Sequence, residues 1–436
     1  MTRIANAPST ARPTPPASQV PNPGCRLFVP VRVGFVMHKM QVAGAEVLVQ
    51  QIIQRLRGVV DATVYCLDGL GELGHQLRDA GTDVVVLGRK PGLDWDVAKR
   101  LASDFQTRGI EVAHAHQYTP FFYSALAKMR GRCRTKLIFT EHGRHYPDVV
   151  SWKRRLANRL VLQRFAVAST ACCDFSTQAL REIEGFPSTF TLRNGVDLTE
   201  LPPRGNAQSQ TELRASLGLD ADRPYAACIA RFHPVKDHQT LIRAWKRVHQ
   251  LVPHARLLLV GDGPERERIA QAVKENASSN QFESSVEFWG IRDDVADILR
   301  AVDVFTLTSV SEAASLTLLE AMASQCASVV TDVGGNGEHI RHSTEGFLVP
   351  RGDDEALAQR LCQMLEDRSL CRELGVAARD RVIAEFELAD VVTRYRDLYL
   401  KHAGRSTTEN AIARMPSGNQ AGLHDEKPVA CMVEMK

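Results

Sequence analysis

The chain has 436 residues, of which 44% are hydrophobic and 24% are charged, and its formal net charge at pH 7 is +3. This length has room for two or three domains, and the composition is that of a globular protein. The small net charge gives no reason to expect a nucleic-acid partner, and no apolar run approaches the ~18–20 residues of a membrane-spanning helix. The ten cysteines lack a C-x-x-C pair or another metal-binding spacing, so we expect a reduced, cytoplasmic chain without a metal site.

The two ends of the chain differ in composition from its middle. Residues 1–30 begin with a stretch rich in Pro, Ser, Thr and Ala, and residues 404–436 are mostly polar. Neither segment offers enough apolar surface for a core, so we expect a disordered leader and a disordered tail.

Between these ends, short apolar runs alternate with longer helical patterns. This alternation predicts an α/β fold in which helices cover both faces of parallel sheets. Helical patterns lie between many of the predicted strands, at residues 45–56, 123–130, 152–165, 238–249 and 356–366. The predicted strands are residues 32–37, 62–67, 84–87, 112–116, 136–140, 166–172, 189–192, 225–230, 256–260, 286–289, 302–307 and 328–331.

These strands are too many for one ordinary sheet. Residues 204–222 follow two prolines and hold a polar run and a short helix, so they predict a linker. We therefore predict one α/β domain over residues 31–203 and another over residues 223–387. Two such domains leave a cleft along the carboxyl ends of their strands, where ligands bind in open α/β sheets.

A glycine lies where the first predicted strand turns into a helix. Gly44, in the sequence VAGAE, would let phosphate oxygens approach the backbone N–H groups at this turn. The alternative is that Gly44 only makes the turn, and the loop alone does not decide between the two.

Histidines end two successive strands of the first domain. His116 falls at the carboxyl end of the strand 112–116, and a polar cluster that includes His142 follows the strand 136–140. A single histidine at a strand end usually packs or caps. Because two strands deliver histidines to the same edge, we expect a site there, with His116 facing the cleft.

Two basic residues follow the first predicted strand of the second domain. Arg231 comes directly after residues 225–230, and Lys236 precedes a helix for which Asp237 is the expected N-cap. A guanidinium and an ammonium in these places can hold two phosphates from different sides. The alternative is a pair of solvated basic residues.

Glycines end three further strands of the second domain. Gly261 follows residues 256–260, although its G-x-G sequence alone is a weak sign of a nucleotide site. Gly290 follows residues 286–289, and the loop that begins at Ile291 would cover a base with backbone contacts. Residues 331–338 form a Gly-rich loop that would either approach a phosphate or sugar hydroxyl or only make a tight turn.

Two glutamates flank the start of a predicted helix over the latter part of residues 308–323. Glu312 precedes the helix and Glu320 lies in its second turn, so the helical part alone separates them by roughly 6–8 Å, the reach of a diphosphate. Ser315 is the expected N-cap, and free N–H groups around Leu316 would favour phosphates between the two acids. The alternative is a helix with one solvated glutamate at each end.

Taken together, these motifs resemble those of glycosyltransferase family 4. The matching sequences are ARFHPVKD, VGDGP, the turn at Gly290, E-x7-E with LEAMA, and GG-x-x-E, preceded by VAGAE, HAH and NGVD. The resemblance covers residues 30–402 and implies the GT-B architecture, with two Rossmann-like domains and a last helix, 388–403, that crosses back to the first domain. It also implies a retaining transferase that uses a nucleoside-diphosphate sugar as co-substrate and needs no cofactor or metal.

The resemblance implies a role for each site residue. Arg231 and Lys236 would bind the diphosphate, Glu320 the ribose, and Glu312 the hydroxyls of the donor sugar. His116 would lie near the transferred sugar. The other residues of the expected donor site are Gly44, which would lie near the phosphates, Gly261, Gly290, Ile291, Ser315 and Leu316.

Two positions depart from the family pattern. Ala313 and Ala314 stand where glycine is usual after the first glutamate, and Ala43 stands where a second glycine is common before Gly44. A methyl group near the sugar changes the shape of the pocket, so these departures leave the donor sugar open. The D-x-D string that begins at Asp94 follows a Pro-Gly turn and predicts a loop or a helix start.

The expected reaction is transfer of a sugar to an acceptor hydroxyl with retention. No nucleophile is evident beside the sugar, which favours a front-face mechanism. The sequence TEHGRHYPD is similar to that of a subgroup associated with bacterial exopolysaccharide assembly, so we expect a role in exopolysaccharide or other cell-surface glycan biosynthesis. Two alternatives stay open: a nucleotide-sugar epimerase of the same architecture, and a non-catalytic glycosyltransferase-like scaffold.

One predicted helix carries a basic and apolar surface. Residues 151–165, SWKRRLANRLVLQRF, could rest on the anionic inner face of the plasma membrane and so favour a lipid-linked saccharide as acceptor. The alternative is an ordinary helix with a solvated basic face. Its basic residues are Lys153, Arg154, Arg155, Arg159 and Arg164.

Overall fold

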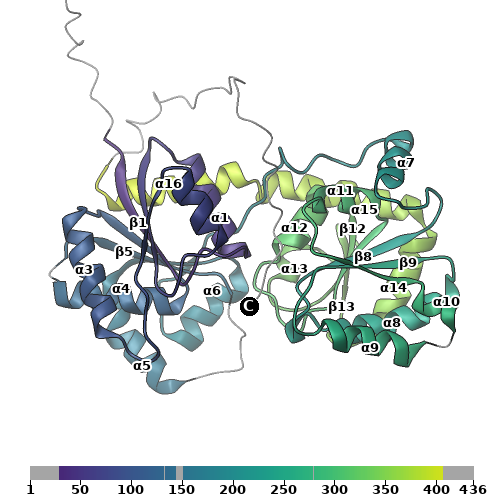
Figure 1. Ribbon diagram of the computed structural model, residues 1–436, viewed down its shortest axis with the longest axis horizontal. Helices are drawn as coiled ribbons and strands as arrows, with labels where there is room; N and C mark the ends of the chain where they lie inside the picture. The colour runs from purple at the N-terminus through teal and green to yellow at the C-terminus, as the bar shows by residue number, and fades with distance from the viewer. Residues whose placement is uncertain (1–28, 132, 144–150, 278, 406–436) are drawn as a thin grey trace, which may run out of the picture.

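A computed structural model of the chain describes residues 29–131, 133–143, 151–277 and 279–405. The predicted leader and tail lie almost wholly outside these residues. The described chain forms two parallel sheets, side by side, each with helices on both faces (Figure 1). None of its helices combines the length and the apolar content that crossing a bilayer requires.

The first sheet has seven parallel strands in the order β3-β2-β1-β4-β5-β6-β7. Two apolar cores flank it: α1, α2 and the last helix of the chain, α16 (Leu388–His402), cover one face, and α3 and α4 cover the other. The order reverses between β1 and β4, which opens a crevice at their carboxyl ends. The elements are β1 Val31–Met37, α1 Gly44–Arg55, β2 Val60–Cys66, α2 Glu72–Asp79, β3 Asp83–Val86, α3 Trp95–Thr107, β4 Val112–His116, α4 Tyr118–Gly131, β5 Lys136–Glu141, α5 Trp152–Leu160, β6 Ala166–Ala171, α6 Asp174–Ala179 and β7 Phe190–Thr191.

The second sheet has six parallel strands in the order β10-β9-β8-β11-β12-β13 around one large core. Its order reverses between β8 and β11, so a second crevice opens there. The elements are α7 Ala207–Ser216, β8 Tyr225–Ile229, α8 His238–Leu251, β9 Arg256–Val260, α9 Arg266–Asn276, α10 Asn280–Glu283, β10 Val286–Gly290, α11 Val295–Ala301, β11 Val304–Leu307, α12 Leu316–Ala323, β12 Ala327–Thr331, α13 Asn336–His339, β13 Gly346–Val349, α14 Asp354–Glu366, α15 Arg368–Glu385 and α16 Leu388–His402.

The predicted α/β fold with two parallel sheets is confirmed, and every predicted strand is found. The sequence prediction missed β13, because its four residues, GFLV, are a short run between polar segments. It also drew one helix over residues 152–165. In the structure α5 ends at Leu160, because the backbone of the following Val161 is not helical. A separate 3-10 turn follows at Leu162–Phe165.

The last helix, α16, packs on the first domain although it follows the second in sequence. Its apolar side chains, among them Val391, Tyr395 and Tyr399, belong to the core that contains β1 and α1. The Tyr399 hydroxyl also lies 2.8 Å from Nδ1 of His114 in β4. Figure 1 shows α15 and α16, in yellow-green, along the edge that joins the two domains. The helix α16 therefore links the second domain, which it follows in sequence, to the core of the first domain.

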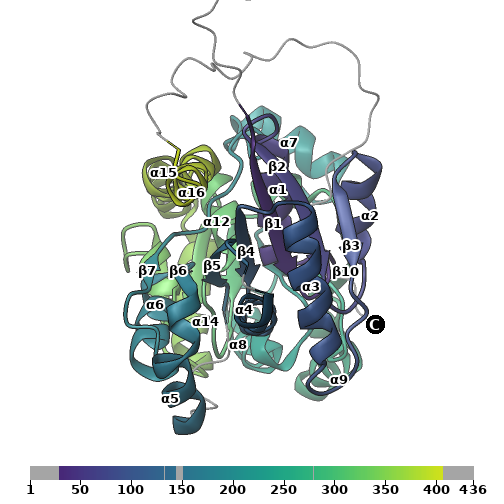
Figure 2. The ribbon, with the colours of Figure 1, turned by 90° about the vertical axis from the view of Figure 1, so that its left-hand side faces the viewer.

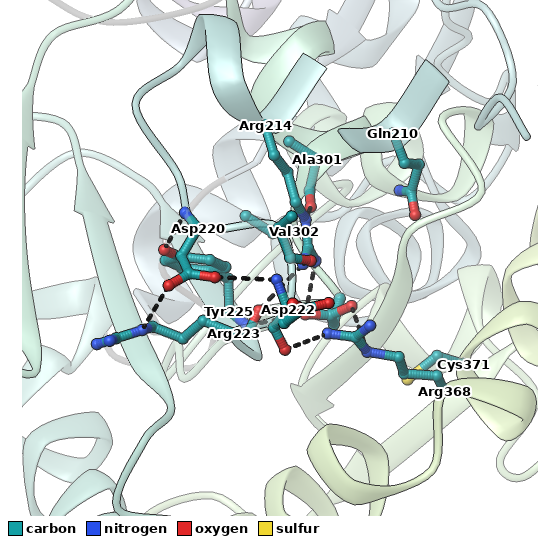
Figure 3. Close-up of polar contacts among 12 residues, drawn as sticks. Gln210, Arg214, Asp220, Asp222, Arg223, Tyr225, Ala301, Val302, Arg368 and Cys371 are labelled. Atoms are coloured by element: carbon teal, nitrogen blue, oxygen red, sulfur yellow. Dashed lines mark hydrogen bonds and ion pairs between the residues drawn. The ribbon is translucent and has the colours of Figure 1, made fainter. Parts of the chain in front are cut away.

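The predicted linker, 204–222, contains a helix that is attached to the second domain. Arg214 of α7 is only 3% exposed and donates to the Asp303 carboxylate at 2.9 Å and to the Ala301 carbonyl at 2.8 Å (Figure 3). The same carboxylate accepts the backbone N–H of Tyr225 at 2.8 Å. Since Tyr225 begins β8 and Asp303 precedes β11, this ion pair joins α7 to the two central strands.

Replacing Arg214 tests this attachment. Arg214→Ala should lower the free energy of unfolding of the second domain by about 3–5 kcal/mol, because it removes the nearer cation of the buried Asp303 carboxylate and leaves only Arg368, at 3.9 Å. Arg223→Ala is the control, since its partner Asp220 is 54% exposed and such surface pairs contribute only ~0–1 kcal/mol. Urea unfolding of the purified variants gives both values, and equal losses would contradict the role assigned to Arg214.

Candidate active site

The loops that carry the predicted site residues follow the strands on either side of the two crevices. Gly44 follows β1, His116 ends β4, Lys236 follows β8 and Glu312 follows β11. Gly44, Lys236 and Glu312 line a cavity of about 290 Å³ between the domains, which we call the basic cavity. Its lining includes Gly44, Glu46 and His142 from the first domain and Arg231, Lys236, Glu312, Ser315 and Leu316 from the second.

A second cavity, of about 620 Å³, adjoins the first and shares Leu316 with it. We call it the acidic cavity, because its lining includes Asp197, Glu200, Asp293 and Glu320. Ile291 lies here too. The structure thus divides the predicted donor residues between two adjoining cavities. Gly261 and Gly290 line neither of them; instead the Gly261 N–H donates to the Gly290 carbonyl at 2.7 Å.

Lys236 and Glu312 form an ion pair in the wall of the basic cavity. The Lys236 side chain is 21% exposed and that of Glu312 is 11% exposed. Ser309 also donates a hydrogen bond to this carboxylate, at 2.5 Å. Of the four side chains that the sequence predicted to converge, Lys236 and Glu312 form an ion pair and Arg231 lines the same cavity. Glu320 lines the adjoining acidic cavity.

Local structure fixes the position of Lys236. It ends a single 3-10 turn, and Asp237 follows in the left-handed region at φ 44° with its carboxylate accepting the Thr240 N–H, so Asp237 is the N-cap of α8 as predicted. The hydroxyl of Thr308, directly after β11, donates to the Lys236 and Asp237 carbonyls at 3.0 Å. These contacts hold the loops after β8 and β11 together.

Arg231 adds a second cation to the basic cavity. Its Nε is buried and has no hydrogen-bond partner among the described residues. Buried donors in folded proteins are nearly always paired, so a cavity-facing guanidinium with an unused donor is suited to an anionic ligand. Arg231 and Lys236 thus place two cations in the lining of this cavity, beside the start of α12, where Ser315 caps the helix by accepting the Leu318 N–H.

Glu320 lies in α12 and faces the acidic cavity. Burial, and after it the negative charge of Glu200, raises the pKa of Glu320 to about 7. Burial and the neighbouring Asp197 also raise the pKa of Glu200. A carboxylate in this setting gains from a ligand that donates hydrogen bonds, such as a sugar diol.

The first domain contributes a glutamate that the sequence prediction missed. Glu46 lies in the first turn of α1, is 6% exposed, and lines the basic cavity. Burial raises its pKa to about 7. Gly44, two residues earlier, lies against α12, since a Cβ at this position would be 3.2 Å from Cδ1 of Leu316. The VAGAE motif held a usable signal, because an acid two residues after Gly44 lies in the same helical turn.

The structure places His142 at the basic cavity and His116 behind it. His116 is 0% exposed, and its Nδ1 lies 2.7 Å from Nε2 of His142, with the two rings stacked. Burial lowers the pKa of His116 well below its usual value and that of His142 to about 4. Both imidazoles are therefore neutral at pH 7. The prediction that His116 faces the cleft is corrected to His142, which His116 positions.

The Gly-rich loop supports the site without lining it. The Gly335 N–H donates to the Glu312 carbonyl at 3.1 Å, and a Cβ on Gly334 would be 1.7 Å from that carbonyl oxygen. The glycines therefore let this loop pack closely behind the Glu312 loop. The Glu338 carboxylate at its end accepts the backbone N–H groups of Asp174 and Phe175, each at 2.7 Å, so the loop also contacts α6 of the first domain.

The structure also places the two alanines that depart from the family pattern and the D-x-D string at Asp94. Ala313 lies at the domain boundary, where a Cβ on Gly143 would be only 2.7 Å from the Ala313 Cβ, and Ala314 lines the basic cavity. The departures from the family pattern thus do lie at the site. Asp94 is the N-cap of α3 and accepts the N–H groups of Asp96 and Val97, which confirms the D-x-D string as a helix start.

Comparison of the sequence with known protein families identifies glycosyltransferases over both domains. The model for glycosyltransferase family 4 matches residues 42–200, and that for glycosyl transferases group 1 matches residues 223–367. N-acetyl-alpha-D-glucosaminyl L-malate synthase of Bacillus anthracis is 30% identical over 312 residues, covering 71% of this chain and 79% of that protein. The chain belongs to glycosyltransferase family 4.

Other similarities to this family 4 glycosyltransferase are more distant or partial. The UDP-Gal:alpha-D-GlcNAc-diphosphoundecaprenol alpha-1,3-galactosyltransferase of Escherichia coli is 27% identical over 212 residues, 48% of this chain and 53% of that protein. The crystal structure of Anabaena Alr3699/HepE in complex with UDP superposes with a TM-score of 0.75 at 21% identity, covering 85% of this chain and all of that chain. This likeness confirms the GT-B fold.

The pKa of Glu46 predicts a change of stability with pH. Its pKa of about 7 in the folded chain exceeds the ordinary 4.5, so the folded chain binds more protons between these values, and stability falls as the pH rises through 7. Glu46→Gln has the shape of the protonated glutamic acid but cannot ionise, so this variant should not lose stability as the pH rises. We therefore expect the variant to melt at a higher temperature than the wild type at pH 8, and this difference should nearly disappear at about pH 4, below the ordinary pKa of the carboxyl.

The exposed Glu72 in the first turn of α2 provides the matched control. Glu72→Gln should give no pH-dependent difference in melting temperature. A Glu46→Gln variant that is less stable than the wild type at pH 8 would contradict the burial of this carboxyl.

Proposed function

We propose that this family 4 glycosyltransferase moves a sugar from a nucleoside-diphosphate sugar to an acceptor hydroxyl, with retention at the anomeric carbon. The observation that carries the proposal is the convergence of Arg231, Lys236 and Glu312 on one cavity between the domains, with Glu320 in the adjoining cavity. Two cations and two acids in this order match a ligand with a sugar, a diphosphate and a ribose.

The diphosphate would lie in the basic cavity. As the bond to the sugar breaks, negative charge grows on the leaving diphosphate, and Arg231 and Lys236 are positioned to stabilise it. Lys236 has three N–H donors, so it can contact a phosphate and Glu312 together. The backbone N–H groups at the start of α12 would add to this charge stabilisation. We propose that these groups do the work that a metal ion does in other transferases.

The nucleoside would occupy the acidic cavity. The Glu320 carboxylate would accept hydrogen bonds from both ribose hydroxyls, and the backbone at Ile291 would contact the base. The Anabaena protein of the same fold was crystallised with UDP, which makes UDP the first nucleotide to test.

The retaining reaction would proceed by front-face attack of the acceptor. A double displacement needs a free carboxylate beside the anomeric carbon, but Glu312 is held by Lys236 and Ser309. Glu46 has a pKa of about 7 and is therefore partly protonated near neutral pH. The leaving diphosphate itself is then the available base for the acceptor hydroxyl, while His142 and Glu46 are placed to orient the transferred sugar or the acceptor.

We further propose that the acceptor is a lipid-linked saccharide, and that the product enters exopolysaccharide or another cell-surface glycan. The name of the Escherichia coli relative specifies a diphosphoundecaprenol-linked acceptor, which supports this class. The proposal places the chain in the cytoplasm, where nucleotide sugars are made.

Two substitutions test the diphosphate contacts. Arg231→Ala and Lys236→Ala should each lower the rate of transfer by about 100-fold or more, because each removes a charged donor from the leaving group. Arg247→Ala is the control, since Arg247 is exposed and pairs with Asp354 away from both cavities. Transfer is measured by release of nucleoside diphosphate with each acceptor, and near-normal rates in either site variant would count against the proposal.

The donor is identified by melting temperature. A nucleotide that binds only the folded chain raises this temperature in proportion to RT ln(1 + [L]/Kd). We expect a rise with one of UDP, GDP and ADP, and no rise for the same nucleotide with Arg231→Ala. Binding by none of the three would favour a non-catalytic scaffold, and conversion of a nucleotide sugar without an acceptor product would favour an epimerase.

A further inference from the structure

Helix α5 is attached to the first domain by one face only. Arg154 forms an ion pair with Glu184, whose side chain is 2% exposed. Asn158, one turn later and fully buried, donates to the Glu184 carbonyl at 2.8 Å and accepts from the Tyr118 hydroxyl at 2.8 Å. These contacts fix how the helix is rotated about its axis, and so determine which side chains face outward.

The outward face is apolar. Trp152, Leu156 and Leu160 follow each other at a spacing of four residues and are 68%, 48% and 51% exposed. At 3.6 residues per turn this spacing places them on one side of the helix, opposite Arg154 and Asn158. A single exposed leucine needs no explanation, but an apolar stripe along a whole helix marks an interaction surface.

Basic side chains border this stripe on both sides. Lys153 lies on one side and Arg155 and Arg159 on the other, and all three are exposed. The segment 151–165 contains five basic residues and no Asp or Glu. An outward apolar face with flanking Lys and Arg is the pattern of a helix that lies in the headgroup region of an anionic bilayer.

The position of α5 leaves this stripe accessible. Figures 1 and 2 show α5 at the extreme end of the first domain, with no other labelled element beyond it. In sequence, only residues 144–150 separate it from Gly143, which lines the basic cavity.

We propose that α5 docks this protein on an anionic lipid bilayer, with Trp152, Leu156 and Leu160 inserted among the acyl chains and Lys153, Arg155 and Arg159 at the phosphates. Charge decides between this partner and a second copy of the chain. Two α5 helices face to face would bring together six exposed cations, Lys153, Arg155 and Arg159 of each copy, on helices that contain no acid, whereas anionic lipid phosphates complement each of them. The proposal does not depend on the identity of the donor.

The test is sedimentation of the full chain with vesicles. The wild type should bind vesicles that contain phosphatidylglycerol and should bind phosphatidylcholine vesicles far less. Neutralising Lys153, Arg155 and Arg159 to Gln should lower the partition coefficient by about 100-fold, at roughly 1 kcal/mol for each charge. A Trp152→Ser, Leu156→Ser, Leu160→Ser variant should lose binding even with its charges intact.

Matched controls come from the second domain. Leu251→Ser changes a leucine that is also 68% exposed, and Lys274→Gln neutralises an exposed lysine, so neither should alter binding. Every variant should keep the nucleotide-induced rise in melting temperature, which separates this test from that of the proposed function. Vesicle binding that survives both α5 variants, no binding by the wild type, or a dimer that the Ser variant dissociates would each overturn the proposal.

Discussion

The ion pair between Lys236 and Glu312 is the interaction on which the site depends. Removing two charges from water costs several kcal/mol for each ion, and a pair recovers this only when further hydrogen bonds satisfy both partners. Here Ser309 supports the carboxylate, and the Thr308 hydroxyl holds the backbone of Lys236. A pair of this kind adds little to stability, but it holds a cation and an acid side by side at the junction of two strands.

That arrangement depends on the contact between the domains. The Gly-rich loop packs against the backbone of Glu312 and reaches α6 of the first domain through Glu338. On the opposite side of the cleft, Gly44 lies against Leu316 at the start of α12. Movement of one domain against the other would therefore displace the Glu312 loop and the helix start together. The candidate active site therefore depends on the arrangement of the two domains, which α16 helps to maintain.

Much of the fold was predictable because it depends on local patterns. Buried parallel strands are continuous apolar runs, and the N-caps at Asp237 and Ser315 are short polar side chains just before a helix, so both leave a clear trace in the sequence. The four-residue β13 leaves no such trace. The convergence of Arg231, Lys236 and Glu312 was predictable because parallel strands deliver their carboxyl ends to one edge.

The errors concern features that only the three-dimensional arrangement decides. His116 is paired in register with Thr140, so His142 lies two residues further along the chain, closer to the cleft. The alternation of side chains along a strand shows which face a residue lies on. It does not show which of two neighbouring strands extends further toward the cleft. The GG-x-x-E loop would look the same in sequence whether it approached a phosphate or packed against Glu312. Its glycines serve close backbone packing.

A crystal structure of the chain with bound UDP tests the central claim most directly. The account predicts that the diphosphate oxygens lie within hydrogen-bond distance of the Arg231 guanidinium and the Lys236 ammonium, and that the ribose hydroxyls contact the Glu320 carboxylate. A nucleotide bound outside the two cavities, or held there with these side chains turned away from it, would contradict the account.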